Sequence, residues 1–315
     1  MKKIENNSLP KVSVVIPTYK RSHLIGRAVK SVLNQAYQNF EIIIIDDSPD
    51  DETEKIVKNF NDIRIKYTRN KIRRNFSGAK NQGVEESSPD SKYIAFLDDD
   101  DEYFPLFLEK TIRRLEKKKD VGYVITQPEV RLQNGERLRQ IPGEWNWDET
   151  WNKNVGNGCV LRKEIFTKEN IWFDEKCLFE DLDLGLRILQ RFKGEFMSDV
   201  LRAYYYPLIK GESHSTSFTK ETPSEEIEYF YKKNYQIYKK AGKKALAFVH
   251  FLTGKTFSKA GQMKKGRFHL LKAFQCYSRL EYLFYYLLAL FFPKSFQSSY
   301  LIILKTKIFG RWTKL

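Results

Sequence analysis

The segment YIAFLDDDDEY, residues 93–103, joins a continuous apolar run to four consecutive aspartates. An apolar run of this length is typical of a strand buried on both faces of a sheet. Two carboxylates about 4 Å apart repel each other by roughly 4 kcal/mol at an effective dielectric near 20. Two interpretations are open: a solvated turn in which one aspartate caps a helix beginning near Pro105, or a group of carboxylates that share a cation.

The same alternation of apolar run and amphipathic segment extends along the chain on both sides of this segment. Strands are expected at residues 12–17, 40–45, 63–67, 93–97 and 121–127, and helices at 22–35, 50–60, 77–87 and 105–119. Four or five such units predict an α/β fold with a mostly parallel sheet and helices on both faces. Ligands of such sheets bind at the carboxyl ends of the strands, where Asp46–Asp47 and Asp98–Asp101 both fall.

A third acidic pair, Glu180–Asp181, opens a helix expected over residues 179–192. Taken alone, Asp47 has the ordinary explanation of a turn residue, and Asp181 that of a charge favourable to a helix N-terminus. Taken together, the three sites favour Mg²⁺ or Mn²⁺ bound by carboxylates and a substrate diphosphate. A further carboxylate at a helix start could then deprotonate an acceptor hydroxyl.

Composition and cysteine usage limit the class of protein. The chain has 315 residues, of which 41% are hydrophobic and 30% charged, as expected for one large folded domain with a smaller appendage. Three cysteines without metal-ligand spacing predict reduced cytosolic thiols rather than a zinc site or a disulfide framework. The N-terminal apolar run is short and is expected to be a strand, so secretion is not expected.

The excess positive charge lies in the last third of the chain. Residues 1–220 hold 37 Lys and Arg against 35 Asp and Glu, whereas residues 221–315 hold 18 against 5. We therefore expect two domains, residues 1–224 and a basic, aromatic-rich helical region at 225–315. The apolar run at 282–292 is too short to span a bilayer, which needs about 20 residues. It fits either a helical bundle with a solvated basic face or, as we favour, contact with an anionic membrane surface.

Five segments, in order and spacing, resemble family 2 glycosyltransferases with a GT-A type, Rossmann-like fold. They are VSVVIPTYKR (12–21), FEIIIIDDS (40–48), FSGAKNQGV (76–84), YIAFLDDDDEYFP (93–105) and FDEKCLFEDLDLGLRI (173–188). The resemblance covers roughly residues 10–210. Two positions depart from the family pattern: Ser48–Pro49 replace the usual Gly-Ser, and Lys80 stands before Asn81 where the family usually has Arg. A lysine can face a phosphate, but only as a point charge.

The resemblance implies a role for individual residues. It implies nucleotide contacts for Thr18, Tyr19, Asp47, Lys80, Asp98 and Asp99. Asp100, together with Asp98, would hold the divalent cation, although four consecutive aspartates leave the register open by one residue. Asp181 would be the catalytic base, with Glu180 beside it on the acceptor side.

The implied reaction is inverting transfer of a sugar from a nucleotide-diphosphate donor, with a UDP-sugar as the default. The acceptor would be a hydroxyl of a glycan or a lipid-linked saccharide, in cell-surface polysaccharide or glycoconjugate assembly at the cytoplasmic face of a membrane. Trp145, Trp147 and His214 are candidates for the acceptor side. Loop indoles more often pack against the body of a protein, and a lone loop histidine is more often simply exposed.

Three other classes of function fit the sequence less well. A nucleic-acid-binding protein fits the basic tail, but no nucleic-acid motif is present and the acidic strand ends would repel phosphate without a metal. A metal-dependent nucleotidyltransferase also places acids at strand ends, but this sequence has no N-terminal glycine-rich phosphate loop. A catalytically inactive glycan-binding relative is disfavoured because every key carboxylate is present.

Overall fold

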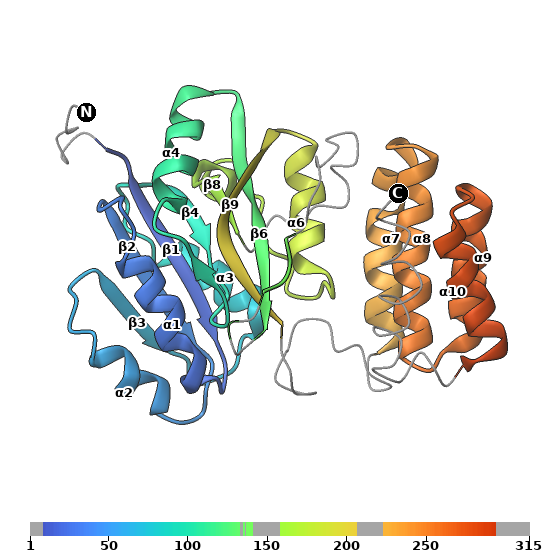
Figure 1. The fold of residues 1–315 in the computed structure, drawn as a ribbon, viewed down its shortest axis with the longest axis horizontal. Helices are drawn as coiled ribbons and strands as arrows, with labels where there is room; N and C mark the ends of the chain where they lie inside the picture. The colour runs from blue at the N-terminus through green and yellow to red at the C-terminus, as the bar shows by residue number, and fades with distance from the viewer. Residues whose placement is uncertain (1–8, 133–134, 136, 141–157, 207–222, 294–315) are drawn as a thin grey trace. The chain divides into compact units, whose positions relative to one another are not determined.

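The structure is a computed structural model that describes residues 9–132, 135, 137–140, 158–206 and 223–293. The chain divides into two compact units (Figure 1). The first comprises Met1–Glu175 and Glu180–Glu212, and the second comprises Lys176–Phe179 and Ser213–Leu315. The exact boundary expected near Ser224 stays a prediction, although a helix does begin at that residue.

The first unit is a sheet covered by helices. Its described strands are β1 (Lys11–Thr18), β2 (Phe40–Asp46), β3 (Ile65–Arg69), β4 (Ser91–Phe96), β5 (Glu102–Tyr103), β6 (Val121–Leu132), β7 (Arg137–Gln140), β8 (Cys159–Arg162) and β9 (Lys193–Tyr206). Its described helices are α1 (Ser22–Leu33), α2 (Glu52–Lys58), α3 (Asn75–Glu85), α4 (Phe107–Lys117), α5 (Glu164–Thr167) and α6 (Glu180–Leu189). The predicted α/β class with helices on both faces is confirmed.

Alternate residues of the central strands face two separate cores. On β1, Val12, Val14 and Ile16 pack with α1 and α4, whereas Val15 packs with α3, α5 and α6 on the other face. Successive side chains of a strand point to opposite faces, so a continuous apolar run is required where both faces are covered. This explains why β1, β2 and β4 lack the polar alternation of a half-exposed sheet.

The sheet is more mixed than the βα repeat alone suggests. The strand order is β3-β2-β1-β4-β8-β6-β9-β5, with β7 paired to β6. β1 is parallel to both β2 and β4, and β6 is parallel to β9. However, β8 lies antiparallel between β4 and β6. The helix between β4 and β6 therefore does not join neighbouring strands, which local periodicity cannot reveal.

Parallel pairing brings the acidic segments to one edge of the sheet. Thr18 at the end of β1 is the register partner of Asp46 at the end of β2. The backbone N–H of Leu97, just beyond β4, donates to the carbonyl of Val15. The loops after β1, β2 and β4 consequently leave the sheet side by side. The nucleotide and metal residues expected from the sequence lie at these strand ends, except Lys80, which lies on α3.

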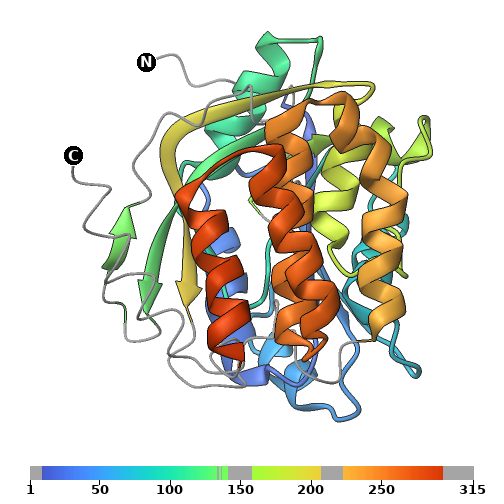
Figure 2. The same ribbon diagram turned by 90° about the vertical axis from the view of Figure 1, so that its right-hand side faces the viewer.

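The second unit is helical. It contains α7 (Ser224–Lys240), α8 (Lys243–Lys259), α9 (Met263–Cys276) and α10 (Leu280–Phe291), which lie alongside one another in Figure 2. Phe251, Leu270, Tyr282 and Tyr285 form part of a core shared by α8, α9 and α10. Among the described residues, no helix is both long enough and apolar enough to cross a bilayer.

Candidate active site

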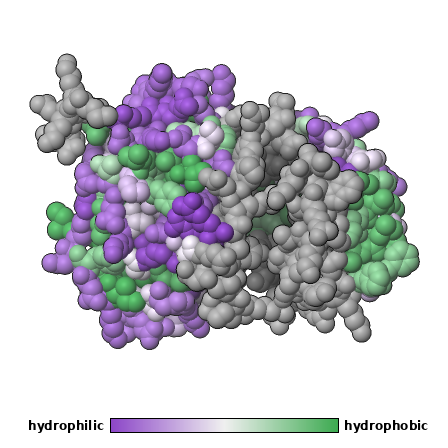
Figure 3. All heavy atoms as spheres, viewed as in Figure 1, coloured by the Kyte–Doolittle hydropathy of each residue, from purple (hydrophilic) through white to green (hydrophobic). Residues whose placement is uncertain are grey.

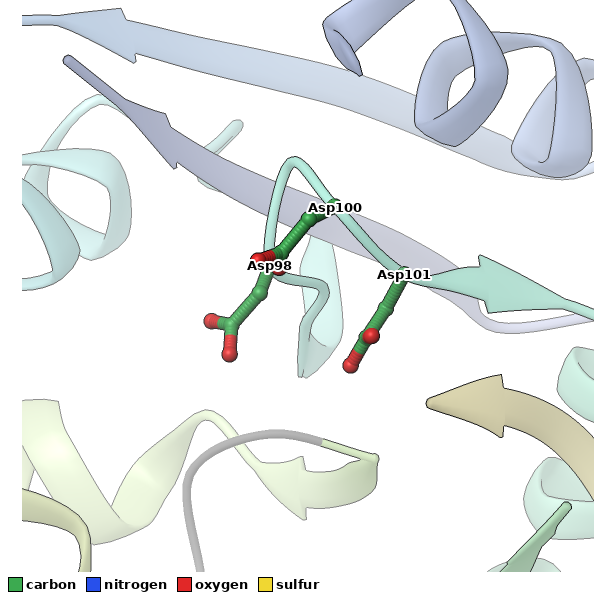
Figure 4. A group of neighbouring side chains, drawn as sticks. All are labelled: Asp98, Asp100 and Asp101. Atoms are coloured by element: carbon green, nitrogen blue, oxygen red, sulfur yellow. The ribbon is translucent and has the colours of Figure 1, made fainter. Parts of the chain in front are cut away.

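Three of the four consecutive aspartates gather on one side of the loop after β4. Figure 4 shows the side chains of Asp98 and Asp101 pointing the same way, with Asp100 beside Asp98. One carboxylate oxygen from each of the three residues lies within 4.8 Å of the others. The backbone N–H of Tyr205 also donates to Asp101 Oδ1 at 3.0 Å. The predicted pair Asp98 and Asp100 is therefore joined by Asp101, which the sequence analysis did not single out.

These carboxylates fit a hard divalent cation. The pKa of Asp98 is raised to about 6, chiefly by burial and then by the nearby carboxylates of Asp100 and Asp181, against the opposing effect of Lys80. A cation would relieve this repulsion, and carboxylate oxygens are the ligands that Mg²⁺ and Mn²⁺ take. The identity of the metal stays a prediction.

Asp99 is not part of this group and has partners from the first strand and the turn after it. Its carboxylate accepts a hydrogen bond from Thr18 Oγ1 at 2.6 Å and is paired with Arg21, whose Nη2 lies 2.6 Å from Asp99 Oδ1. Arg21 Nη1 also donates to Asp100 Oδ2 at 2.9 Å. Because Asp99 is completely buried, this placement favours a supporting role over the direct nucleotide contact expected from the sequence.

The solvated-turn interpretation of the four aspartates is wrong. Helix α4 has Leu106 at its N-cap and no side-chain cap hydrogen bond. Asp99 and Asp101 are both buried rather than hydrated. Burial opposes the charge on Arg21, but Asp99, Asp100 and Asp98 together raise the pKa of its guanidinium above the ordinary value. This arginine, which follows the first strand, is a functional candidate that the sequence analysis missed.

A pocket beside β1 and β2 contains three predicted nucleotide residues. Thr18, Tyr19 and Asp47 line it, together with Pro17, Arg73, Asn75, Phe76 and Ala79. The Arg73 guanidinium lies 4.1 Å from the centre of the Tyr19 ring. The Asp47 carboxylate accepts hydrogen bonds from Asn70 Nδ2 at 2.8 Å and from the backbone N–H of Arg74 at 3.0 Å. A carboxylate has about four acceptor positions, so Asp47 can accept further donors.

Lys80 and the helix α6 form the third part of the site. Lys80 Nζ lies 2.7 Å from Asp181 Oδ1 and 3.8 Å from Glu180 Oε1. Burial raises the pKa of Glu180 to about 7, followed by the effect of Asp181. The acidic first turn of α6 also suits the positive end of the helix dipole. The structure thus places Lys80 against the predicted base, and its predicted contact with the diphosphate stays a prediction.

The remaining acceptor-side predictions fall elsewhere. Trp145, Trp147 and His214 lie outside the described residues.

Asp46, which neighbours Asp47, is completely buried and accepts hydrogen bonds from the Tyr67 hydroxyl and the Ser48 backbone. It serves the turn after β2 and not a ligand.

Comparison with known proteins shows the family. The model of "Glycosyl transferase family 2" matches residues 13–168. The chain is 32% identical over 187 residues to the Escherichia coli UDP-Glc:alpha-D-GlcNAc-diphosphoundecaprenol beta-1,3-glucosyltransferase WfgD, covering 57% of this chain and 70% of that protein. The chain belongs to glycosyl transferase family 2.

Two further similarities agree with this result. A Campylobacter jejuni protein, GalNAc(5)-diNAcBac-PP-undecaprenol beta-1,3-glucosyltransferase, is 31% identical over 196 residues, which are 60% of this chain but only 51% of that protein. The Pyrobaculum calidifontis mannosyltransferase PcManGT, solved with GDP-Man and Mn²⁺, has a TM-score of 0.60 at 16% identity and covers 99% of this chain and 90% of that one. The predicted GT-A type fold is therefore confirmed.

Proposed function

We propose that this protein transfers a sugar from a nucleoside diphosphate sugar to a hydroxyl of a lipid-linked saccharide, with inversion at the anomeric carbon. The observation that carries the proposal is the convergence of carboxylates from distant segments. Asp98 follows β4, Asp181 lies at the start of α6, and both carboxylates raise the pKa of the Lys80 ammonium from α3. A group of acids at the same edge of the sheet as the pocket lined by Thr18, Tyr19 and Asp47 suits a donor that carries its own phosphates.

The carboxylates of Asp98, Asp100 and Asp101 would hold a divalent cation. When bound, such a cation neutralises a diphosphate leaving group. The pairing of Asp99 with Arg21 and Thr18 would hold in place the loop from which the other three aspartates bind the cation.

The pocket lined by Tyr19 and Asp47 would take the nucleobase. A carboxylate accepts hydrogen bonds and cannot donate them, so it suits the N3–H of uracil or thymine or the N1–H of guanine. Cytosine lacks this ring N–H but can donate to a carboxylate through its exocyclic amino group, so the contact with Asp47 does not select the base by itself. We propose a uridine donor. The name of the E. coli relative, which specifies UDP-Glc, supports uridine.

Asp181 would be the general base. The acceptor O–H proton passes to its carboxylate while the acceptor oxygen forms a bond to the anomeric carbon. The bond from that carbon to the diphosphate oxygen breaks in the same displacement, and the diphosphate leaves with the electron pair. One displacement inverts the configuration and requires no nucleophilic side chain.

A nucleotide screen tests the donor assignment. Thermal unfolding would be followed with UDP-, GDP-, dTDP- and CMP-sugars, each with and without Mn²⁺. Stabilisation by UDP-sugars only when Mn²⁺ is present is expected, whereas CMP-sugars should have no effect. A shift with GDP-, dTDP- or CMP-sugars but not with UDP-sugars would overturn the uridine donor, and a shift with none of the four would favour an inactive relative.

The second unit would hold the enzyme at an anionic membrane surface. Large apolar side chains on α9 and α10 lie exposed, namely Phe268, Leu280, Leu287, Phe291 and Phe292. Figure 3 shows apolar residues gathered over these helices. Lysines lie among them, with Lys272 Nζ 5.9 Å from the Phe268 ring centre. Apolar side chains flanked by cations are the pattern of an interfacial helix on anionic lipid.

The names of the relatives and the state of the cysteines support a proposal for the acceptor and the location. By name, the two curated relatives act on undecaprenol-linked acceptors, which supports a lipid-linked acceptor for this chain. The three cysteines are free thiols, which agrees with a reducing compartment. We propose the cytoplasmic face of a membrane as the place of action.

Sedimentation with vesicles tests the membrane surface. The double variant Phe291→Ser/Phe292→Ser should lose binding to vesicles that contain phosphatidylglycerol, and wild-type binding should weaken with salt. The matched control is Ile63→Ser/Ile72→Ser, because both isoleucines are exposed in the first unit. Equal binding by the two double variants would contradict the assignment of α10.

A further inference from the structure

We propose that Lys80 is a positioning residue, whose ammonium holds the carboxylate of Asp181 in place for proton transfer. This inference rests on the proposed function, because Asp181 matters only if it is the base. It differs from the diphosphate contact that the family resemblance implies for this position. The structure offers two independent reasons for it: the placement of the ammonium, and the way in which its helix is fixed to α6.

The ammonium of Lys80 is buried among carboxylates. The residue is only 2% exposed, and its Nζ lies 2.7 Å from Asp181 Oδ1. Glu180 Oε1 is the next carboxylate oxygen, at 3.8 Å, and the Phe173 ring centre lies 5.1 Å from Nζ. A buried ammonium is retained only when it is paired, and the shortest of these contacts is with Asp181.

Helix α3 has little freedom to move Lys80 elsewhere. A Cβ added to Gly83 would lie 2.2 Å from Val15 Cγ1, so the helix backbone packs directly on β1. One turn earlier, Ala79 packs against Ile43 and Ile45 of β2. The backbone that carries Lys80 is therefore fixed against the central strands of the sheet.

The segment before α6 is tied to the same helix. Asn81, beside Lys80, donates through Nδ2 to the Phe173 carbonyl at 3.1 Å and accepts from the Phe173 N–H at 3.0 Å. Within α6, Arg187 donates to the Trp172 carbonyl at 2.6 Å. These bonds set the distance between α3 and α6. Lys80 and Asp181 thus face each other from two elements held in register.

The charges explain why a cation is needed there. Asp98, Glu180 and Asp181 would repel one another in a poorly hydrated site if Lys80 were neutral. Burial disfavours the charged ammonium, yet Asp181, Asp98 and Glu180 together raise its pKa above the ordinary value. Without the ammonium, the Asp181 side chain would turn toward solvent and lose its orientation toward the acceptor.

Three variants separate positioning from diphosphate binding. They are Lys80→Met, Lys80→Arg and the control Lys66→Met, which removes a lysine at the same 2.7 Å distance from a buried carboxylate, Glu41. Steady-state turnover would give kcat and the donor KM, and titration calorimetry would give the affinity for UDP with Mn²⁺.

Lys80→Met should lower kcat by about 100-fold, the lower range of a general-base contribution, with donor KM and UDP affinity within about twofold of wild type. Lys80→Arg should recover about tenfold of that loss, because it restores a cation beside Asp181. Lys66→Met should change neither constant. A large rise in donor KM with kcat unchanged would show that Lys80 binds the diphosphate, and would overturn the proposal.

A second experiment needs neither metal nor substrate. Urea unfolding of Lys80→Met, Asp181→Asn and the double variant should be non-additive, because the second substitution costs less once the pair is broken. Additive losses of unfolding free energy would show that the pair is absent. This result would overturn the proposal even if the protein is a glycosyltransferase. Failure of every nucleotide sugar to bind would instead refute the proposed function. If Lys80→Met does not fold, the effects of Lys80→Arg on kcat and on donor KM distinguish positioning of Asp181 from binding of the diphosphate.

Discussion

The two units bury different kinds of ionisable group. In the first unit Asp46, Asp99 and Asp183 are completely buried, each with hydrogen-bonding or cationic partners, at or near strand ends and a helix start. In the second unit the buried ionisable groups include His250 and His269, whose Nδ1 atoms lie 3.1 Å apart. The first unit therefore buries carboxylates that have polar or cationic partners, whereas the second buries a pair of imidazoles.

The two units of this chain therefore differ in where their charged groups lie. Carboxylates brought together at a strand end cost free energy that a folded protein has no structural reason to bear. The first unit bears that cost at the strand-end edge, next to the pocket. Residues 221–315 hold 18 Lys and Arg, and among those that the structure describes, Lys239, Lys264 and Lys272 are exposed.

The largest effect should come from the proposed base. Asp181→Asn keeps the size of the side chain but removes its ability to accept a proton, so kcat should fall about 1,000-fold. UDP affinity with Mn²⁺ should stay within about twofold, because Asp181 lies at α6 and not in the nucleotide pocket. The control is Glu180→Gln on the same helix turn, which should lose far less. The opposite ranking would make Glu180 the base, as its raised pKa would allow.

The Glu180→Gln variant should also change how the free energy of unfolding depends on pH. The pKa of Glu180 rises from 4.5 to about 7 on folding, so the folded state holds this proton more tightly than the unfolded state. The wild type therefore loses free energy of unfolding as the pH rises from about 4.5 to about 7. Without metal, the variant should be more stable by roughly 3 kcal/mol near pH 8 and equal to wild type near about pH 4. Chemical denaturation at both pH values is the measurement, and equal stability throughout would contradict the burial of a charged Glu180.

The second unit should respond to pH with the opposite sign and a smaller effect. Burial lowers the pKa of His250 and His269 to about 4, so the unfolded state takes up protons first. Stability contributed by these neutral histidines is present above about pH 6.5 and is lost as the pH falls toward about 4. His269→Gln should reduce the loss between about pH 7 and pH 5 by about 1 kcal/mol. His23→Gln, an exposed histidine on α1, is the control, and an identical response of both variants would contradict this account.

The sequence predicts the elements of the first unit better than their pairing. The apolar runs that became β1, β2 and β4 locate the strands and their acidic ends, because burial on both faces leaves a continuous signal. Predicted edges were less accurate: the strand expected from Ile63 begins at Ile65. The insertion of antiparallel β8 between β4 and β6 has no local signature, since it depends on contacts between residues far apart in sequence.

The site shows the same division. Residue types and positions at strand ends predicted Asp47, Asp98, Asp100 and Asp181 as candidates. They could not predict which aspartate of the run faces inward, because a loop has no fixed side-chain period. The contact of Lys80 with Asp181 and that of Arg21 with Asp99 join residues 101 and 78 positions apart. Such ion pairs follow from the packing of α3 and of the turn after β1, and become visible only in the folded structure.

The most direct test of the central claim is whether the aspartates after β4 bind a cation together with a nucleotide. Titration calorimetry of UDP would be carried out on wild type and Asp100→Ala, with and without Mn²⁺. The account predicts that wild-type binding requires Mn²⁺ and that Asp100→Ala weakens it at least tenfold, or about 1.4 kcal/mol. Binding that is equally strong without metal, or unchanged in the variant, would contradict a cation site at these aspartates.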